Sequence, residues 1–336
     1  MKSVPRYSIL VPAHNEEAVL AECHRRLTEV MDSTGERYEI IFIDDGSRDR
    51  TGAILQELAD ADPNVKVIGF SRNFGHQIAI SAGMDHASGD AVIVIDADLQ
   101  DPPSVILQMI AKWKEGYDVV YGRRGERQGE TAFKKATAFV FYRLLRGLTD
   151  VDIPPDVGDF RLIDRKVCEV MSRIRERNRF VRGLISWVGF RQTAVSYVRE
   201  KRFAGETKYP LSKMLRFAFD AIFGFSYRPL KLASYLGVLT SLAGFIYFVY
   251  AMYLKFFTSR TVQGWTSIIG LNLVFNGIVL LILGIMGEYL GRIYDESKAR
   301  PFYVVRDKLG FEDERRDRGE PVEELPRPRR IARGGR

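Results

Sequence analysis

The sequence predicts an α/β domain followed by a two-helix membrane hairpin. Apolar, strand-like segments alternate with amphipathic helical segments through the first half of the chain, a pattern typical of a parallel sheet with helices on both faces. Polar side chains with oxygen ligands follow several of these strands. Two long uncharged segments lie in the second half, and each is long enough to cross a bilayer.

Composition limits the classes of protein that the chain can belong to. Its 336 residues allow one large domain or two modest ones, with enough apolar residues to bury a real core. The two cysteines, Cys23 and Cys168, lie among apolar residues, so we expect small core side chains rather than a disulfide or a metal pair. No signal peptide is expected, because residues 8–11 read as a first strand.

The expected elements follow in a regular order. After the strand at 8–11, Asn15 is a good N-cap for a helix with apolar residues at helical spacing until Gly35. Ligands of such sheets bind beyond the carboxyl ends of the strands. Further strands are expected at 40–43, 65–70, 91–95, 118–121 and 195–199, and further helices at 51–60, 77–87 and 103–114.

The strand at 91–95 ends in a pattern suited to a hard cation. Asp96, Asp98 and Gln100 follow it at alternate positions. Mg²⁺ or Mn²⁺ takes carboxylate and carbonyl oxygens and fills its remaining positions with substrate phosphates, so the pattern favours a diphosphate-bound substrate. Solvated acids before a Pro-Pro turn would give the same short pattern, and the motif alone leaves that alternative open.

A second pair of acids follows the strand at 40–43. Asp44 and Asp45 precede Gly46 and Ser47, and carboxylates in this turn could accept hydrogen bonds from a base or a ribose. Solvated turn acids remain the alternative. The chain has no G-x-G-x-x-G after the first strand and no G-K-[ST] loop, which argues against a classical dinucleotide-binding domain or an NTPase.

Five motifs together resemble a known family. VPAHNEE at 11–17, IDDGSRDRT at 43–51, SRNFGHQ at 71–77, DADLQDPP at 96–103 and GDFRL at 158–162 occur in the order seen in inverting glycosyltransferases of family 2. The branch that they resemble makes polyprenyl-phosphate sugars, as bactoprenol glucosyltransferases and dolichyl-phosphate mannose synthases do. The resemblance runs over residues 7–294 and implies a cytosolic GT-A domain, which is Rossmann-like.

The resemblance implies roles for the strand-end residues. A divalent cation, Mg²⁺ or Mn²⁺, would be held by Asp96, Asp98 and Gln100, with Asp98 as a catalytic residue. The nucleotide sugar would be bound by Pro12, Ala13, Asn15, Glu16, Asp44, Asp45, Arg72, Asp96 and Ala97.

A basic loop is the candidate site for the acceptor phosphate. The loop at 122–135 is rich in glycine and basic residues, and the resemblance places the acceptor phosphate on Arg124 and on Lys134 or Lys135. It also implies a mobile loop at 200–209, from which Arg202 and Lys208 reach a phosphate. An exposed solubilising loop is the alternative at 122–135, since charge runs are usually solvated.

Asp159 in GDFRL is the family's candidate base. A phosphate monoester has a second pKa of about 6 and needs little deprotonation at neutral pH, so we expect Asp159 to orient the acceptor or a sugar hydroxyl, with base catalysis as the lesser alternative. Farther on, Arg179 and Arg182 could line the acceptor pocket and Trp187 could lie beside the sugar. Solvated arginines beside a buried tryptophan fit the same stretch.

The second half of the chain predicts a membrane hairpin. Residues 232–254 comprise 23 residues without a charge and residues 261–287 comprise 27, and at about 1.5 Å per residue each exceeds the roughly 30 Å hydrocarbon core. The connection at 255–260 holds two cations, whereas residues 292–336 hold 13 Lys or Arg. The positive-inside rule then puts the catalytic domain and both termini in the cytoplasm, in a multi-pass inner-membrane protein.

These boundaries divide the chain into four parts. We expect a GT-A domain at 1–210, an amphipathic segment at 211–228 in the membrane interface, two spans at about 232–254 and 264–287 within 229–291, and a basic tail at 292–336. Disorder is expected from about Phe311. Because the tail carries part of the net charge of +7, the basic balance needs no nucleic acid to explain it.

The sequence therefore predicts transfer of a hexose from a nucleotide sugar to polyprenyl (undecaprenyl) phosphate with inversion, for cell-envelope glycan or glycoprotein modification. UDP-glucose is the favoured donor, with GDP-mannose and UDP-linked amino sugars open, and a homo-oligomer is expected. A non-catalytic nucleotide-sugar-binding subunit of a lipid-sugar transport complex is the alternative from another class. A processive polysaccharide synthase ranks lower, because no Q-x-x-R-W follows GDFRL.

Overall fold

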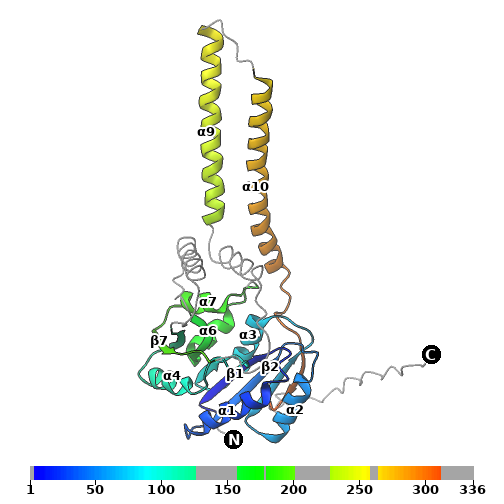
Figure 1. Cartoon of the computed structure of the whole chain (residues 1–336), viewed down its shortest axis with the longest axis vertical. Coiled ribbons are helices and arrows are strands. Elements are labelled where there is room, and N and C mark those ends of the chain that lie inside the picture. The colour runs from blue at the N-terminus through cyan, green and yellow to red at the C-terminus, as the bar shows by residue number, and fades with distance from the viewer. Residues whose placement is uncertain (1–3, 126–156, 178, 201–227, 258–263, 312–336) are drawn as a thin grey trace, which may run out of the picture.

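The computed structural model of the chain describes residues 4–125, 157–177, 179–200, 228–257 and 264–311. One mixed sheet with helices on both faces forms the α/β domain, and two long helices project from it (Figure 1). The predicted α/β domain with two long apolar helices is confirmed.

The centre of the sheet is a parallel, fully buried group of strands. β1 (Tyr7–Ala13) lies between β2 (Tyr38–Asp44) and β4 (Ala91–Val94), and every residue of the three strands is buried. Tyr7 pairs with Tyr38 on one side and with Ala91 on the other, so the three strands start level and their carboxyl ends meet at one edge. Apolar side chains on both faces give these strands their continuous hydrophobic runs.

The outer strands make the sheet mixed rather than parallel. β6 (Val157–Asp164) runs antiparallel between β4 and β5 (Val119–Arg124), and β8 (Val305–Leu309) runs antiparallel beside β3 (Val65–Phe70). The expectation of a parallel sheet is wrong for these two strands, neither of which was predicted from the sequence. With β7 (Gln192–Tyr197) at the edge, the strand order is β7-β5-β6-β4-β1-β2-β3-β8.

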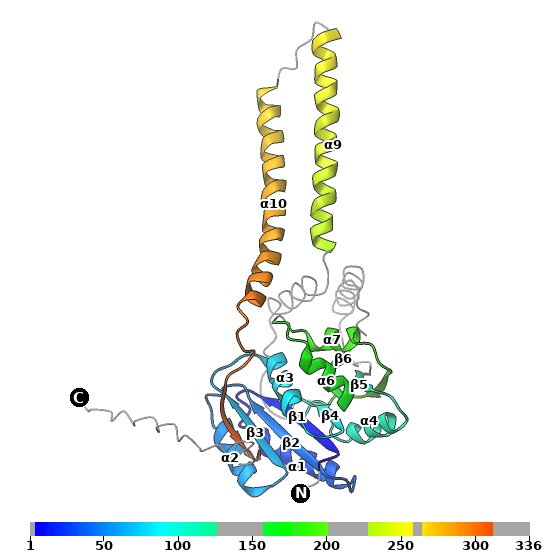
Figure 2. The same cartoon turned by 180° about the vertical axis from the view of Figure 1, so that it is seen from behind.

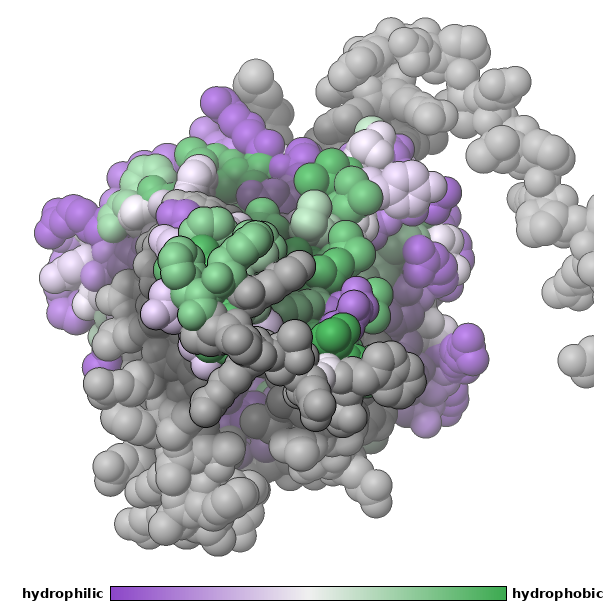
Figure 3. All heavy atoms as spheres, turned by 90° about the horizontal axis from the view of Figure 1, so that it is seen from above, coloured by the Kyte–Doolittle hydropathy of each residue, from purple (hydrophilic) through white to green (hydrophobic). Residues whose placement is uncertain are grey.

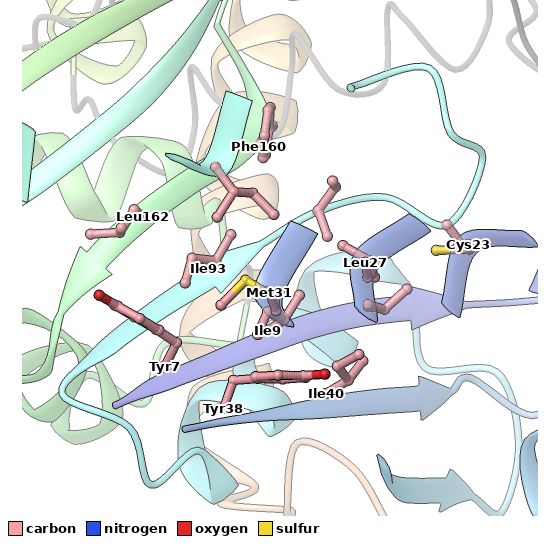
Figure 4. Close-up of a cluster of buried hydrophobic side chains, with 14 of the residues drawn as sticks. Tyr7, Ile9, Cys23, Leu27, Met31, Tyr38, Ile40, Ile93, Phe160 and Leu162 are labelled. Carbon is pink, nitrogen blue, oxygen red and sulfur yellow. The ribbon is translucent and has the colours of Figure 1, made fainter. Parts of the chain in front are cut away.

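Two apolar layers fix the helices to the sheet. On one face, α1 (Leu20–Asp32), α2 (Thr51–Ala61) and α4 (Val105–Lys114) pack on the sheet, as Figure 4 shows for Leu27 and Met31 of α1 beside Ile9. The other face is covered by α3 (His76–His86), α6 (Arg165–Arg173) and α7 (Val181–Trp187). Cys23 and Cys168 are free and buried in these two layers, as predicted.

Asn15 does not cap the first helix. The helix begins at Leu20 with Val19 at the N-cap position, and Asn15 lies earlier in the loop with a φ of 56°. Its Oδ1 accepts a hydrogen bond from the amide of Arg48 instead. Asparagine tolerates the left-handed conformation better than most residues, so the same side chain that suggested a cap stabilises a turn.

The two projecting helices are long and apolar enough to form a membrane hairpin. α9 (Arg228–Phe257) contains a candidate span at Ala233–Leu254, and α10 (Trp265–Ser297) contains one at Ile268–Ser297. Large apolar side chains such as Leu239, Phe248 and Leu280 are 59–69% exposed along them, a surface that is costly in water. Seen from above, green apolar side chains gather over the helices and purple hydrophilic ones lie around them (Figure 3).

The expected tail boundary at residue 292 is wrong. α10 continues to Ser297, about ten residues beyond the expected end of the second span, and β8 then rejoins the sheet. The strand β8, VRDKL, is mostly charged, so it did not stand out from the basic composition of the whole tail. The rest of the expected tail, 312–336, and the amphipathic segment at 211–227 lie outside the described residues.

A buried polar network holds the amino-terminal edge of the sheet. The Glu39 carboxylate on β2 accepts hydrogen bonds from the Ser8 hydroxyl on β1 and from the amide and hydroxyl of Ser88, and its other oxygen lies 2.6 Å from Lys66 Nζ on β3. Burial alone would raise the pKa of Glu39, but Lys66, Ser8 and Ser88 lower it below its ordinary value. One carboxylate thus ties three strands together at the edge opposite the predicted site.

We predict that Glu39→Gln lowers the free energy of unfolding by roughly 1.5–3 kcal/mol at pH 7, because a charge-assisted network becomes a neutral one. Since folding lowers the pKa of Glu39, its contribution is complete above the ordinary pKa and is lost as pH falls through the folded value. The difference between the two proteins, measured by chemical denaturation, should therefore shrink below about pH 4.5. Exposed Glu36→Gln is the control, and an equal effect there would contradict the role of Glu39.

Candidate active site

The predicted donor residues come together where β1 and β2 end. The amide of Asp45 donates to the carbonyl of Ala13 at 2.9 Å, and the amide of Asn15 donates to Ser47 Oγ at 3.0 Å. Pro12 pairs with Ile43 in the two strands, and the amide of Glu16 donates to Thr51 Oγ1. The loops after β1 and β2 therefore form one joined surface, which carries six of the predicted nucleotide-sugar residues.

The two neighbouring aspartates on this surface have different surroundings. Asp44 accepts the amide of Ser47 at 2.9 Å with Oδ1, and its Oδ2 lies 3.4 Å from Arg306 Nη2. Asp45 accepts the amides of Phe74 and Gly75 at 2.6 and 2.9 Å. Burial raises the pKa of Asp45, although those two amides act to lower it. Asp45 therefore holds the loop after β3, and Asp44 is the better placed of the two for a nucleoside.

Arg72 lies beside this loop as predicted. Its guanidinium is 4.0 Å from the centre of the Phe74 ring, and its Nη1 donates to the carbonyl of Asn73. Gly46, with a φ of 66°, allows the loop after β2 to pass close to the backbone of Arg72, where a Cβ would overlap it. Only glycine fits this crossing without strain.

The loop after β4 presents the acidic pattern at the same edge. Asp98 Oδ1 accepts the amide of Gln100 at 3.1 Å, and Leu99 between them has a φ of 57°, which is a rare conformation for a bulky residue. Ala97, in the same loop, is buried. The strained turn holds the carboxylates of Asp96 and Asp98 beyond the end of the strand.

Asp96 has the electrostatics of a cation site. Its Oδ1 is buried and accepts no hydrogen bond from the part of the chain that the structure describes. Burial raises its pKa above the ordinary value, and the charges of Asp159, Asp101 and Asp98 add to the rise, while His76 opposes it. The described part of the chain holds no group of three His, Cys, Asp or Glu that could hold a metal ion. Asp96 and Asp98 could supply two oxygens to a cation whose other ligands come from substrate.

His76 joins the acidic loop to GDFRL, and the sequence reasoning assigned it no role. It is the first residue of α3, after Gly75 with a φ of 104°, and its Nε2 lies 3.4 Å from Asp96 Oδ1 and 3.3 Å from Asp159 Oδ2. Burial acts to lower its pKa, but Asp159 and Asp96 raise it to about 9. His76 could have been identified from the sequence, because it lies in SRNFGHQ, after an expected strand and at the start of an expected helix.

Asp159 is held by a dense set of donors. It lies on β6 and is 5% exposed, and Arg182 donates Nε to Oδ1 at 2.8 Å and Nη2 to Oδ2 at 2.9 Å. Gln77 Nε2 donates to Oδ2 at 3.3 Å. Burial would raise the pKa of Asp159, but Arg182 and His76 hold it well below the ordinary value. A carboxylate with so low a pKa is a weak base near neutral pH, which favours the orienting role.

Of the other described residues predicted near the acceptor and the sugar, only Arg182 contacts Asp159. Arg182 binds Asp159 and so belongs to this network. Arg179 is 8% exposed, donates to the carbonyls of Ile174 and Met171, and therefore stabilises the fold instead of lining a pocket. The alternative of a buried Trp187 is wrong, since its side chain is 65% exposed at the end of α7. Its place beside the sugar stays a prediction.

Arg124 belongs to a positive cluster beside the acidic loop. It ends β5 and pairs in register with Tyr197 of β7, whose hydroxyl donates to Asp101 at 2.5 Å. Arg199 lies 3.5 Å from the same carboxylate, and its pKa is lowered by burial and by the nearby charge of Arg124. The buried Nε of Arg124 has no hydrogen-bond partner among the described residues, whereas the Nε of Arg199 faces Asp101, so Arg124 is the better placed of the two for a further anion. Arg199 was not predicted, and Lys134, Lys135, Arg202 and Lys208 lie outside the described residues.

Comparisons with known proteins agree with the resemblance seen in the motifs. Residues 8–171 match the family model described as glycosyl transferase family 2. The chain is 63% identical over 310 residues to the uncharacterized glycosyltransferase YkcC of Bacillus subtilis, covering 92% of this chain and 96% of that one. It is 40% identical over 303 residues to the bactoprenol glucosyl transferase of Shigella phage SfV, covering 90% and 99%. It is 39% identical over 301 residues to the prophage bactoprenol glucosyl transferase homolog of Escherichia coli K12, covering 90% and 98%.

We predict strong coupling between Asp159 and Arg182. Removing either partner leaves a poorly solvated charge, so Asp159→Asn and Arg182→Gln should each lower the free energy of unfolding by about 3 kcal/mol. The double variant should lose at least about 1 kcal/mol less than the sum of the two. Chemical denaturation of the full chain in detergent measures all four proteins.

The exposed pair Lys112 and Glu115 provides the matched control for this cycle. Their side chains are 41% and 51% exposed, so solvent screens the pair and the coupling between them should be much smaller than that between Asp159 and Arg182. Additive effects at Asp159 and Arg182 would mean that the carboxylate does not depend on the guanidinium.

Proposed function

The chain belongs to glycosyltransferase family 2, and from that premise we propose that it transfers a hexose from a nucleotide sugar to polyprenyl phosphate. One arrangement carries the proposal: an acidic loop (Asp96, Asp98) and an arginine pair (Arg124, Arg199) at the carboxyl edge of the sheet, in a chain with a hairpin of membrane length. The product is a polyprenyl-phosphate sugar for modification of cell-envelope glycans or glycoproteins.

The relatives support a lipid carrier as the acceptor. Two proteins named for bactoprenol glucosyl transfer align with this chain over 98–99% of their lengths, so the similarity includes the hairpin as well as the α/β domain. Their names favour glucose as the sugar. UDP-glucose is accordingly the donor that we propose, and GDP-mannose is the first alternative to test.

The donor nucleoside would lie on the surface formed by the loops after β1 and β2, with Asp44 accepting hydrogen bonds from it. Its diphosphate would then reach the acidic loop. Mg²⁺ or Mn²⁺ held by Asp96 and Asp98, with Gln100 nearby, would neutralise the negative charge of the leaving diphosphate. The buried Asp96 oxygen, which accepts no hydrogen bond from the described residues, is the feature that fits such a cation.

The arginine pair would bind the acceptor. Arg124 can present two parallel, charge-assisted donors to a phosphate, and Arg199 places a second positive charge beside it. The acceptor phosphate is largely ionised near neutral pH and needs no strong base. Held by the arginines on the side of the sugar opposite the diphosphate, it would displace the nucleotide with inversion. Asp159, fixed by Arg182, would orient a hydroxyl of the sugar or the acceptor.

The hairpin would bring the lipid to this site. A polyprenyl chain requires hydrocarbon and a nucleotide sugar requires water, and the two long apolar helices continue from a domain whose site is polar. By the positive-inside rule, the cations beyond α10 favour a multi-pass protein of the inner membrane with its catalytic domain in the cytoplasm.

A transfer assay tests the proposal. The purified full chain in detergent with Mg²⁺, UDP-[¹⁴C]glucose and undecaprenyl phosphate should move label into an organic-extractable lipid. Transfer of label from GDP-[¹⁴C]mannose and not from UDP-[¹⁴C]glucose would identify GDP-mannose as the donor. If the chain binds nucleotide but transfers no sugar from any nucleotide sugar, the alternative of a non-catalytic subunit is favoured.

Asp98→Asn should reduce this transfer at least a hundredfold, because it removes a negative charge that the cation requires without changing the volume of the side chain. Addition of EDTA to the unmodified chain should have the same effect. Asp90→Asn is the matched control, since Asp90 precedes the same strand at its other end and its side chain is 60% exposed. Full transfer by Asp98→Asn, or in EDTA, would contradict the metal-assisted mechanism.

Arg124→Ala should weaken the interaction with the acceptor phosphate by roughly 1.5–3 kcal/mol, and Arg124→Lys should recover only part of it, because lysine is a single point charge. The apparent affinity for undecaprenyl phosphate measures this loss, while UDP binding without lipid should hardly change. Exposed Arg123→Ala, one residue earlier on β5, is the control. Lost UDP binding with an unchanged affinity for the lipid would put Arg124 on the donor side.

A further inference from the structure

The chain returns from the hairpin to the donor edge of the sheet. After α10, the amide of Ser71 donates to the carbonyl of Val304 at 2.9 Å, and the Tyr303 ring stacks on Phe70 with centroids 5.1 Å apart. The Tyr303 hydroxyl donates to Asp85 of α3 at 3.1 Å. Figure 2 shows this orange segment descending from α10 to the strand beside β3. The base of the hairpin is thus fastened to β3.

β8 is irregular where it passes the end of β3. Asp307 pairs with Gly69 and Val305 pairs with Phe70, so the register shifts at Arg306, which is the extra residue. A bulge of this kind turns a side chain away from the direction that regular alternation would give it. The side chain of Arg306 therefore does not follow the regular alternation of side chains along β8.

Gly69 makes room for the side chains of β8. It pairs with Asp44 on one side and with Asp307 on the other, so these three positions form a row across β2, β3 and β8. A Cβ at Gly69 would overlap the Asp307 carboxylate and would lie 3.0 Å from Arg306 Nη2. The missing side chain leaves the space through which Arg306 reaches Asp44.

The contacts of Arg306 connect two carboxylates. Its Nη2 lies 3.4 Å from Asp44 Oδ2, and its Nε donates to Asp307 Oδ2 at 3.3 Å. Asp44 is 3% exposed, whereas the side chain of Arg306 is 48% exposed. The guanidinium therefore covers a buried carboxylate from the solvent side, where the proposed function puts the nucleoside. The hydrogen bond to Asp307 holds the guanidinium in that position.

We propose that Arg306 is a positioning residue of the donor site, which holds Asp44 in the orientation that binds the nucleoside of the nucleotide sugar. The proposal rests on the proposed function for the role of Asp44. Because β8 begins directly after the segment fastened to β3, the attachment of the hairpin base also sets the affinity for the nucleotide. β8, which follows the hairpin in the sequence, thereby becomes part of the donor pocket.

Binding of UDP and of uridine to the purified full chain in lipid nanodiscs, measured by calorimetry, tests the proposal. Arg306→Ala should weaken both ligands about tenfold, since the nucleoside is common to them, and Arg306→Lys should restore part of the affinity. In the transfer assay the KM for the donor should rise by a similar factor with kcat little changed. Lys308→Ala, which removes a charge from the same strand, should bind like the unmodified chain.

Gly69→Ala offers an independent test, because the new methyl group should displace Asp307 and Arg306. It should weaken UDP about as much as Arg306→Ala does, and the double variant should be no weaker than either. Unchanged UDP binding by Arg306→Ala, while the unmodified chain binds UDP, would overturn this proposal alone. An unmodified chain that binds no nucleotide would overturn the proposed function and this inference with it.

Hydrogen exchange of the unmodified chain provides a readout that does not depend on whether a variant folds. UDP should slow exchange of the Ser71 amide and of the amides in β8, because nucleoside binding and the docked strand stabilise each other. Exchange in β8 that does not respond to saturating UDP would contradict the coupling.

Discussion

The carboxylates crowded at one edge of an apolar sheet are the constraint on which the site depends. Each buried acid needs a partner, and the chain supplies a different one to each: Arg182 to Asp159, the amides after β3 to Asp45, and Tyr197 with Arg199 to Asp101. Asp96 has a buried oxygen that accepts no hydrogen bond from the described residues, although His76 Nε2 lies 3.4 Å from it. This unequal pairing separates the acids that shape the site from the one that is suited to a cation.

The arrangement also separates two kinds of ligand in space. The acidic loop follows β4 near the middle of the sheet, whereas the arginine pair lies at the ends of β5 and β7 toward one side of it. β3 and β8 close the other side, where the segment after α10 is fastened. A donor nucleotide and an acceptor phosphate would therefore approach from different sides of the acidic loop, as an in-line displacement requires.

Much of this could be predicted from the sequence, for definable reasons. Fully buried parallel strands leave continuous apolar runs, so β1, β2 and β4 were placed to within a few residues, and the polar residues after them were expected at one edge. The antiparallel strands β6 and β8 were missed, because GDFRL in β6 was considered only as a motif and β8 is mostly charged and exposed. The partners of Asp159 come from 82 residues before it and 23 after it, and such distant contacts have no local signal. Arg306 was not identified, because residues 292–336 were assigned to a basic tail from their composition alone.

The central claim is that the carboxyl edge of β1, β2 and β4 binds a nucleotide whose diphosphate meets the acidic loop. A cryo-electron-microscopy structure of the full chain in nanodiscs with UDP and Mn²⁺ tests it most directly. The account predicts uridine against the loops after β1 and β2 beside Asp44, and the diphosphate with the metal at Asp96 and Asp98. UDP density on the arginine pair at Arg124, with the acidic loop unoccupied, would contradict it.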